Sequence, residues 1–331
     1  CFKEFDIELG PFNVLIGPND TGKTAFLQAI RLCGALGARL NWDASIAPIE
    51  QELGISLSRE SVWRNDVGLH ISVVTGASGF RDCSLMAHRL FVSLGGGGAR
   101  ASVVRANSPQ DRFPNGNARA WFAEGIGEVR YYRLDPKALR TPRPLGQAMN
   151  EVGDGFPVFL DSINRESRTV FFELESRFYE RFPCYRQLTL PNKGQSLSIA
   201  FETVKGEKLG CESVSDGVML SLAFMAIAHQ PTPPRVLLIE EPENGVHHAS
   251  LKDIVETLKQ LSKDKGVQVI MTTHSPYMLD GVDPGVVQVF QKDEEGAVHA
   301  KRLSDFEGAG EISDMFSTGE KWSLLAEKYG I

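Results

Sequence analysis

The sequence lacks long apolar runs, a surplus of basic residues and paired cysteines. Its longest apolar stretches, such as residues 218–228, are too short to cross a bilayer, so no transmembrane helix is predicted. The 35 Lys and Arg residues are outnumbered by 42 Asp and Glu residues, which argues against non-specific nucleic-acid binding by the whole surface but not against a local basic stripe. The 5 cysteines are scattered without a Cys-x-x-Cys pair, which predicts reduced thiols in a cytoplasmic protein and argues against a disulfide framework or a zinc site.

The beginning of the chain also lacks an apolar leader. Glu4, Asp6 and Glu8 stand where the apolar segment of a secretory signal would be required. The chain opens without Met inside an expected strand, and we interpret it as an N-terminally trimmed fragment. Its 331 residues correspond to about two domains of ordinary size.

Apolar periodicity predicts an α/β protein. The last third alternates between expected helices and strands, which indicates a central, mostly parallel sheet. These elements are a helix over Val214–His229, a strand over Val236–Glu240, a helix over Ser250–Leu261 and a strand over Val267–Thr272. The N-terminal part is expected to form strands over Phe5–Leu9 and Phe12–Ile16 and a helix over Lys23–Ala35, and the C-terminal part strands over Val286–Gln291 and Ala297–Arg302 and a helix over Trp322–Lys328.

The middle of the chain is less regular. Short alternating runs predict antiparallel strands at His70–Val74, Leu90–Leu94, Ala101–Arg105 and Glu128–Arg133, with the glycines of Gly95–Gly98 as a hairpin turn. Residues 161–182 are predicted as one helix, and its aromatic stripe is interpreted as core packing and not as a ligand site.

A phosphate-binding loop follows the second expected strand and opens a helix. The motif G-x-x-x-x-G-K-[ST] is formed by Gly17, Pro18, Asn19, Asp20, Thr21, Gly22, Lys23 and Thr24 and continues into Ala25. Its glycines let backbone N–H groups turn toward a phosphate, and the helix N-terminus adds partial positive charge. We expect Lys23 to reach the β- and γ-phosphates of ATP and the Thr24 hydroxyl to bind Mg²⁺.

Two carboxylates stand at the end of the expected strand Val236–Glu240. Because ligands of open α/β sheets bind at the carboxyl ends of the strands, we expect Glu240 to hold Mg²⁺, through water, and Glu241 to orient or deprotonate the attacking water. The alternative is a solvated acidic strand end. Pro242, which stops the strand just past the pair, and the phosphate loop favour the first interpretation.

Two further segments have both a functional and a structural interpretation. His274 ends the next apolar strand, where it would contact the γ-phosphate, although a His before Ser-Pro is also an ordinary turn residue. Ser215, Asp216 and Gly217 open the helix before the Glu-Glu strand. Ser215 is either a simple helix cap or part of a second anion site with the Gly217 backbone.

The order of these motifs resembles the ABC-class ATPase heads of SMC proteins, RecF and OLD-type nucleases. The stretches Val214–Gly217, Leu238–His247 and Thr272–Pro276, with Tyr131–Pro136, look most like the "predicted ATPase" group of AAA-21/AAA-15 type near the OLD family. The resemblance implies a P-loop ABC-type head with an N-terminal antiparallel β subdomain and an inserted mixed lobe. We therefore expect residues 1–40 and 211–331 to form the head, and residues 41–210 to form the insertion.

The resemblance also implies a homodimer with ATP between two heads, in which Ser215, Asp216 and Gly217 complete the partner's site. Asp20 departs from the family pattern, where Gly is commonest, and Glu240 replaces the more usual Asp. The sequence does not place the glutamine that usually ligates Mg²⁺ between the two halves of such heads, and Gln51 and Gln147 are candidates without further support. A metal site at the adjacent His247 and His248 is not expected, because neighbouring side chains on a strand or turn point apart.

Three biological roles remain open from the sequence. The first is an ATP-driven switch of an anti-phage or DNA-maintenance system with a separate effector, because residues 275–331 are too few for the nuclease domain of OLD proteins. The second is a RecF-like DNA clamp, supported by the basic run Arg130, Arg133, Lys137, Arg140 and Arg143, which is otherwise a solvated face. The third, a transporter ATPase subunit at a membrane, fits worst, because transporter heads have a shorter interval before the signature helix and usually carry Asp-Glu-Pro-Thr.

Overall fold

The structure is a computed structural model that describes residues 5, 7–38, 68–75, 86–95, 98–105, 128–307 and 316–329. The chain divides into two compact units. Unit 1 comprises residues 1–7, 18–129 and 290–300, and unit 2 comprises residues 8–17, 130–289 and 301–331. The described part of residues 130–210 therefore belongs to the same unit as the strand that ends at Glu240. The division at residues 40 and 210 stays a prediction.

A six-stranded sheet has the order β15-β14-β1-β13-β12-β5. Its strands are β1 (Phe12–Ile16), β5 (Val129–Tyr132), β12 (Val236–Glu240), β13 (Gln268–Thr273), β14 (Val287–Lys292) and β15 (Val298–Arg302). β1 pairs in parallel with β13 and β14, and β12 pairs in parallel with β13, which confirms the predicted, mostly parallel sheet. All residues of β1 and β12 are buried, as expected for continuous apolar strands covered on both faces.

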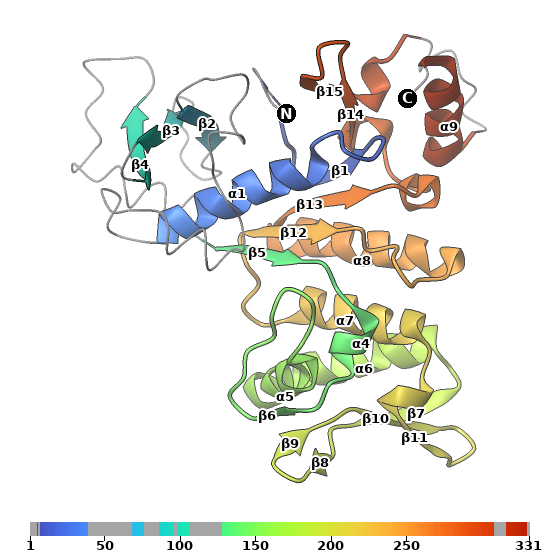
Figure 1. Cartoon of the computed structure of the whole chain (residues 1–331). Coiled ribbons are helices and arrows are strands. Elements are labelled where there is room, and N and C mark those ends of the chain that lie inside the picture. Colours follow the sequence, from blue (N-terminus) through green and yellow to red (C-terminus); the bar gives the residue numbers. More distant parts are fainter. Residues whose placement is uncertain are drawn as a thin grey trace. The chain divides into compact units, whose positions relative to one another are not determined.

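Helices of unit 2 pack beside this sheet in successive layers (Figure 1). Helix α8 (His248–Lys265) contacts β13, and α7 (Asp216–His229) contacts α8. Next along come α6 (Arg168–Arg181), α5 (Phe156–Glu166) and the short α4 (Pro136–Leu139). Every α7 residue from Val218 to Ala228 is buried, because this helix is apolar on all sides and lies between other helices.

The predicted single helix over residues 161–182 is wrong, because Ser167 separates α5 from α6. Ser167 is extended, with φ −150° and ψ 100°, and its Oγ accepts a hydrogen bond from the Val170 N–H at 3.4 Å as the N-cap of α6. The interpretation of the aromatic stripe as core packing is confirmed for Phe171 and Phe178, which are buried. Phe172, in contrast, is 66% exposed.

Two small antiparallel sheets complete the helical side of unit 2. One has the order β11-β10-β7, formed by β7 (Tyr185–Thr189), β10 (Ala200–Thr203) and β11 (Lys208–Gly210). The other has the order β6-β9-β8, formed by β6 (Arg143–Pro144), β8 (Asn192–Lys193) and β9 (Ser196–Leu197). The C-terminal helix α9 (Thr318–Tyr329) buries Trp322 and Leu325.

Unit 1 contains helix α1 (Lys23–Ala38) and an antiparallel sheet of β2 (Gly68–Thr75), β3 (Met86–Gly95) and β4 (Gly98–Arg105). Gly95 pairs with Gly98, which confirms the predicted hairpin. The rings of Phe5, Phe26 and Phe290 lie 5.4–5.7 Å apart and form an aromatic cluster.

The predicted strand Phe5–Leu9 is wrong for its described residues 5 and 7–9, none of which is in a strand. Side-chain contacts, and not the hydrogen bonds of a β-ladder, attach this segment to the sheet. Gln288 Nε2 donates to the Glu8 carbonyl at 3.3 Å, and Arg302 pairs with the Glu8 carboxylate at 2.6 Å. Among the helices that the structure describes, none has the length and apolar character to cross a membrane.

Candidate functional site

The carboxyl ends of three parallel strands meet at one edge of unit 2. Glu240 at the end of β12 is paired with Thr272 of β13, and Thr272 and Thr273 are paired with Leu15 and Ile16 of β1. Gly17, the first residue of the phosphate loop, follows Ile16 directly. The strand that leads into the loop and the strand that carries the two glutamates therefore end at the same edge, as predicted from the sequence.

Glu240 is a buried carboxylate with a phenol as partner. Glu240 is 3% exposed, and its Oε2 accepts a hydrogen bond from the hydroxyl of Tyr131 in β5. A buried carboxyl group requires a hydrogen-bonding partner, because burial removes it from water.

Glu241 leaves the strand in a left-handed conformation. Its φ is 47°, which non-glycine residues adopt rarely and which is found disproportionately at functional sites. The Glu241 N–H donates to the Thr272 carbonyl at 3.1 Å, so the backbone remains attached to β13. The turn thereby directs the two consecutive glutamates to different partners.

Three side chains surround the Glu241 carboxylate. Arg133 Nη2 and Asn244 Nδ2 donate to Oε2 at 3.1 and 2.9 Å, and His274 Nε2 lies 3.3 Å from Oε1. Glu243 holds the backbone at His274 in turn, because Glu243 Oε1 accepts hydrogen bonds from the Thr273 hydroxyl and from the His274 backbone N–H, both at 2.8 Å. The structure thus brings together Glu240, Glu241 and His274, as the strand-end argument predicts.

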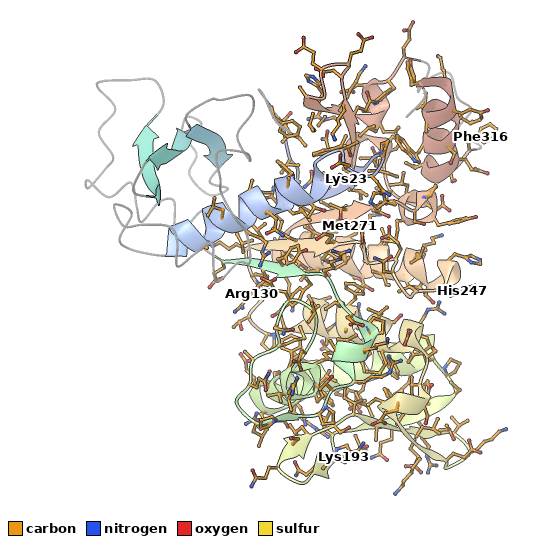
Figure 2. All side chains as sticks on the ribbon, viewed as in Figure 1. Lys23, Arg130, Lys193, His247, Met271 and Phe316 are labelled. Carbon is orange, nitrogen blue, oxygen red and sulfur yellow. The ribbon has the colours of Figure 1, made fainter. Side chains whose placement is uncertain are left out.

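The phosphate loop in unit 1 is curled around its own lysine, which Figure 2 shows at the start of α1. Lys23 is 5% exposed, and its Nζ donates to the Pro18 carbonyl at 2.7 Å and to Thr21 Oγ1 at 3.3 Å. Gly17 and Gly22 have φ values of 151° and 85°, which supply the turns that L side chains disfavour. Thr24 and Ala25 lie in the exposed first turn of α1, and Asn19 is also exposed.

Asp20 is the second non-glycine residue with a positive φ among those described, at 63°. This conformation accounts for the frequent Gly at this position in related loops, and Asp tolerates it better than most residues. Lys292 Nζ lies 2.7 Å from Asp20 Oδ2, and its hydrogen bond lowers the pKa of the Asp20 carboxyl. The pair offsets the negative charge that Asp20 adds to an anion-binding loop.

Ser215 caps α7 in the way that the sequence predicts. Its Oγ accepts the Val218 N–H at 3.4 Å, while Ser215 and Asp216 are exposed and Gly217 is half-buried. Arg140 holds this segment: it pairs with Asp216 Oδ1 at 2.7 Å and donates to the carbonyls of Cys211 and Val214 at 2.9 and 2.7 Å. The capping interpretation is confirmed, and the exposed helix start remains compatible with a second anion site.

Sequence reasoning did not identify Tyr131, Arg133, Arg140 or Asn244 as contacts of the predicted site residues. Spacing carried a partial signal, because Tyr131 and Arg133 lie two residues apart at the end of a predicted strand. The basic run, interpreted as a DNA contact or a solvated face, is in large part paired. Arg133 is bound to Glu241, Arg140 to Asp216, and Arg143 to Asp154 at 2.6 Å.

The remaining candidates lie apart from this cluster. Gln51 is outside the described residues, and Gln147 is exposed after β6. The expectation that His247 and His248 point apart is wrong, because their ring centroids lie 4.1 Å apart. The chain passes there from a loop into α8, so strand alternation does not apply (Figure 2). No group of three or more metal-ligating side chains is found in the described part of the chain.

The chemistry of these residues fits Mg²⁺ and a nucleotide phosphate. A buried carboxylate (Glu240) and a hydroxyl (Thr24) are hard oxygen donors of the kind that Mg²⁺ prefers. The glycines with positive φ at both ends of the loop turn its backbone in the way a phosphate cradle requires.

Comparisons with known proteins agree with this architecture. A family model described as "AAA domain, putative AbiEii toxin, Type IV TA system" matches residues 107–280, more than half of the chain. A stretch of 41 residues is 39% identical to the "Uncharacterized ABC transporter ATP-binding protein YhcH" of Bacillus subtilis (strain 168), and covers 12% of this chain and 13% of that protein.

Two solved structures share the fold. The SMC head bound to the C-winged helix domain of ScpA matches with a TM-score of 0.61 and 16% identity, over 92% of this chain and 94% of that chain. The Pyrococcus furiosus Smc head with an extended coiled coil, bound to the C-terminal domain of ScpA, matches with a TM-score of 0.55 and 14% identity, over 98% and 94%. The chain therefore belongs to the family described as "AAA domain, putative AbiEii toxin, Type IV TA system", as an ABC-class P-loop ATPase with an SMC-head-like fold.

Proposed function

We propose that this chain binds and hydrolyses Mg-ATP and acts as a dimeric nucleotide switch. The observation that carries the proposal is the register of β1, β13 and β12, which brings the start of the phosphate loop, Glu240 and Thr273 to one sheet edge. The separate environments of Glu240 and Glu241 support two different roles for them.

Each residue has a distinct part in this proposal. Lys23 and the loop N–H groups bind the β- and γ-phosphates, while Thr24 and Glu240 hold Mg²⁺, whose charge lowers the barrier to phosphoryl transfer when it is bound. Glu241 orients or deprotonates the attacking water. His274 lies beside Glu241, with its backbone held by Glu243. In this proposal its imidazole would contact the γ-phosphate of bound ATP.

The dimer is proposed from the exposed start of α7. Ser215 and Asp216 are exposed at the N-terminus of a helix of 14 residues, so Ser215 Oγ and the Gly217 N–H are available to a phosphate of a second chain. Arg140 holds the preceding loop in place. In this arrangement one chain alone hydrolyses ATP slowly.

The experiment measures the molar mass of the protein in solution, with and without ATP, for Glu241→Gln and for the unaltered chain. The substitution keeps the shape of the side chain and removes the base, so ATP should trap a dimer. Glu256→Gln, an exposed change on α8, is the matched control and should leave hydrolysis unchanged. A monomer at saturating ATP, with ATP binding demonstrated, would contradict the dimeric switch. Failure to bind ATP at all would contradict the nucleotide site.

The biological role is proposed as that of the ATPase component of a bacterial defence or toxin–antitoxin system, working with a separate effector. The description of the matched family favours this role. A DNA clamp has less support, because three of the five residues in its basic run are in ion pairs within the chain. Expression of the chain in a bacterial host, with and without the neighbouring genes, should alter growth or phage resistance, and Lys23→Ala should abolish the effect.

A further inference from the structure

The end of strand β5 brings one side chain to each of the two consecutive glutamates. Tyr131 donates to Glu240, and Arg133, two residues later, lies 3.1 Å from Glu241. Side chains two residues apart on extended chain lie on the same face. Tyr132, between them, is 6% exposed and belongs to the core instead. A single segment thus reaches both carboxylates of the proposed site.

The Tyr131 contact restricts how Glu240 can present itself. The phenol O–H donates to Oε2, so the protein restricts the orientation of the Glu240 carboxylate. Carboxylates that ligate metals are commonly oriented by such hydrogen bonds, and removal of the partner typically weakens metal binding by about 10- to 100-fold. Tyr131 therefore has the chemistry of a residue that orients a metal ligand.

The Arg133 contact has a different character. The Arg133 side chain is 56% exposed, so its pair with Glu241 is solvated and contributes little to folding. Arg133 shares Oε2 with Asn244, which leaves Oε1 toward His274. The guanidinium therefore holds the Glu241 carboxylate in one rotation, with a defined oxygen toward the histidine.

We propose that Tyr131 and Arg133 are positioning residues, Tyr131 for the cation ligand Glu240 and Arg133 for the water-activating Glu241. The inference rests on the proposed function and adds two residues to it. It divides their effects: Tyr131 acts on cation affinity, and Arg133 acts on turnover.

The test for Tyr131 is the affinity of Tyr131→Phe for Mn²⁺ in the presence of a non-hydrolysable ATP analogue. The electron paramagnetic resonance signal of free Mn²⁺ measures how much of the cation is unbound. Phenylalanine keeps the ring and removes the donor. We expect cation affinity to fall about tenfold. The matched control is Tyr132→Phe, the same chemical change on the buried neighbour, which should bind Mn²⁺ like the unaltered chain. Equal affinities for the two variants, or tighter binding by Tyr131→Phe, would overturn the assignment.

The test for Arg133 is steady-state ATP hydrolysis by Arg133→Gln and Arg133→Lys, with the exposed Arg130→Gln as control. We expect Arg133→Gln to lower kcat about tenfold, a part of the 10²–10⁴-fold that a general base contributes, while KM changes less than about twofold. Arg133→Lys should recover part of kcat, because it restores the charge without the planar guanidinium. An unchanged kcat, or a change in KM alone, would overturn the role of Arg133.

Failure of the inference differs from failure of the proposed function. If the unaltered chain shows no nucleotide-dependent Mn²⁺ binding, both are overturned. If it binds Mn²⁺ and Tyr131→Phe is indistinguishable from Tyr132→Phe, only the inference is overturned. Circular dichroism and urea unfolding of each variant establish that the fold is intact before binding is compared.

Discussion

The Arg140 guanidinium donates a hydrogen bond of 2.7 Å to the carbonyl oxygen of Val214, the residue directly before the N-cap of α7. The same side chain donates to the carbonyls of Cys211 and Pro136 and pairs with Asp216. One arginine, only 14% exposed in its side chain, therefore joins α4 to the loop that presents Ser215 and Gly217.

Arg140→Ala should destabilise unit 2. It leaves the Val214 carbonyl without the Arg140 donor, and an unsatisfied buried acceptor costs about 1–3 kcal/mol, whereas the Cys211 carbonyl keeps the Val214 N–H at 3.3 Å. We expect the free energy of unfolding, measured by urea denaturation, to fall by about 1–3 kcal/mol. The control is Arg165→Ala, whose exposed pair with Asp161 on α5 should contribute less than about 0.5 kcal/mol. Equal effects of the two substitutions would contradict this account.

Phe178→Ala should be among the most damaging changes in the helical part of unit 2. Phe178 is fully buried, with its ring 5.1–5.9 Å from the rings of Phe182, Tyr185 and Phe201. Truncation of such a residue costs about 3–5 kcal/mol. Phe172→Ala on the same helix should change the urea midpoint little, because Phe172 is 66% exposed. A large loss in Phe172→Ala would mean that this ring is covered in solution.

Lys292→Met should weaken ATP binding through Asp20. Without Lys292, the negative charge of Asp20 in the phosphate loop is no longer offset, and we expect the dissociation constant for ATP to rise about three- to tenfold. In an Asp20→Asn background the same lysine substitution should have little effect, because the charge it offsets is gone. A double-mutant cycle with a fluorescent ATP analogue measures this coupling. Additive effects of the two substitutions would contradict it.

His229 should make the fold sensitive to mild acid. Burial lowers the pKa of its imidazole below the ordinary value of 6.5, and the charges of Arg177 and Lys265 act in the same direction. The hydrogen bond from Nδ1 to the Met225 carbonyl and the charge of Glu173 oppose the shift. As pH falls, the imidazole of His229 therefore takes up its proton in the unfolded chain before it does so in the folded chain. The contribution of neutral His229 to the free energy of unfolding is present above about pH 6.5 and is lost as pH decreases through the pKa of His229 in the folded chain.

The measurement is the urea midpoint of the unaltered chain and of His229→Gln, at several pH values from about 7.5 downward. The unaltered chain should lose stability more steeply than the variant as pH falls. Parallel curves would show that other groups determine the acid sensitivity.

Local patterns were sufficient for the elements that carry the proposed chemistry. The strand Val236–Glu240 is predicted to the residue, because four apolar positions precede the glutamates and Pro242 follows them. The cap at Ser215 and the hairpin at Gly95 and Gly98 are also confirmed, since both depend on chemistry within a few residues. The aromatic residues 171–182 did not reveal the break at Ser167, because apolar periodicity continues across it.

The sequence alone determined the phosphate loop and the order of the motifs along the chain. It also determined the sheet edge at which Glu240 and His274 meet, because parallel strands expose their carboxyl ends together. Only the tertiary structure decided that Tyr131 binds Glu240, that Arg133 and Asn244 bind Glu241, and that Arg140 holds the start of α7. The Tyr131 and Arg133 contacts join residues 109 and 108 positions apart. Periodicity and capping rules act over a few residues, whereas such partners are selected by strand order and packing, which no local pattern encodes.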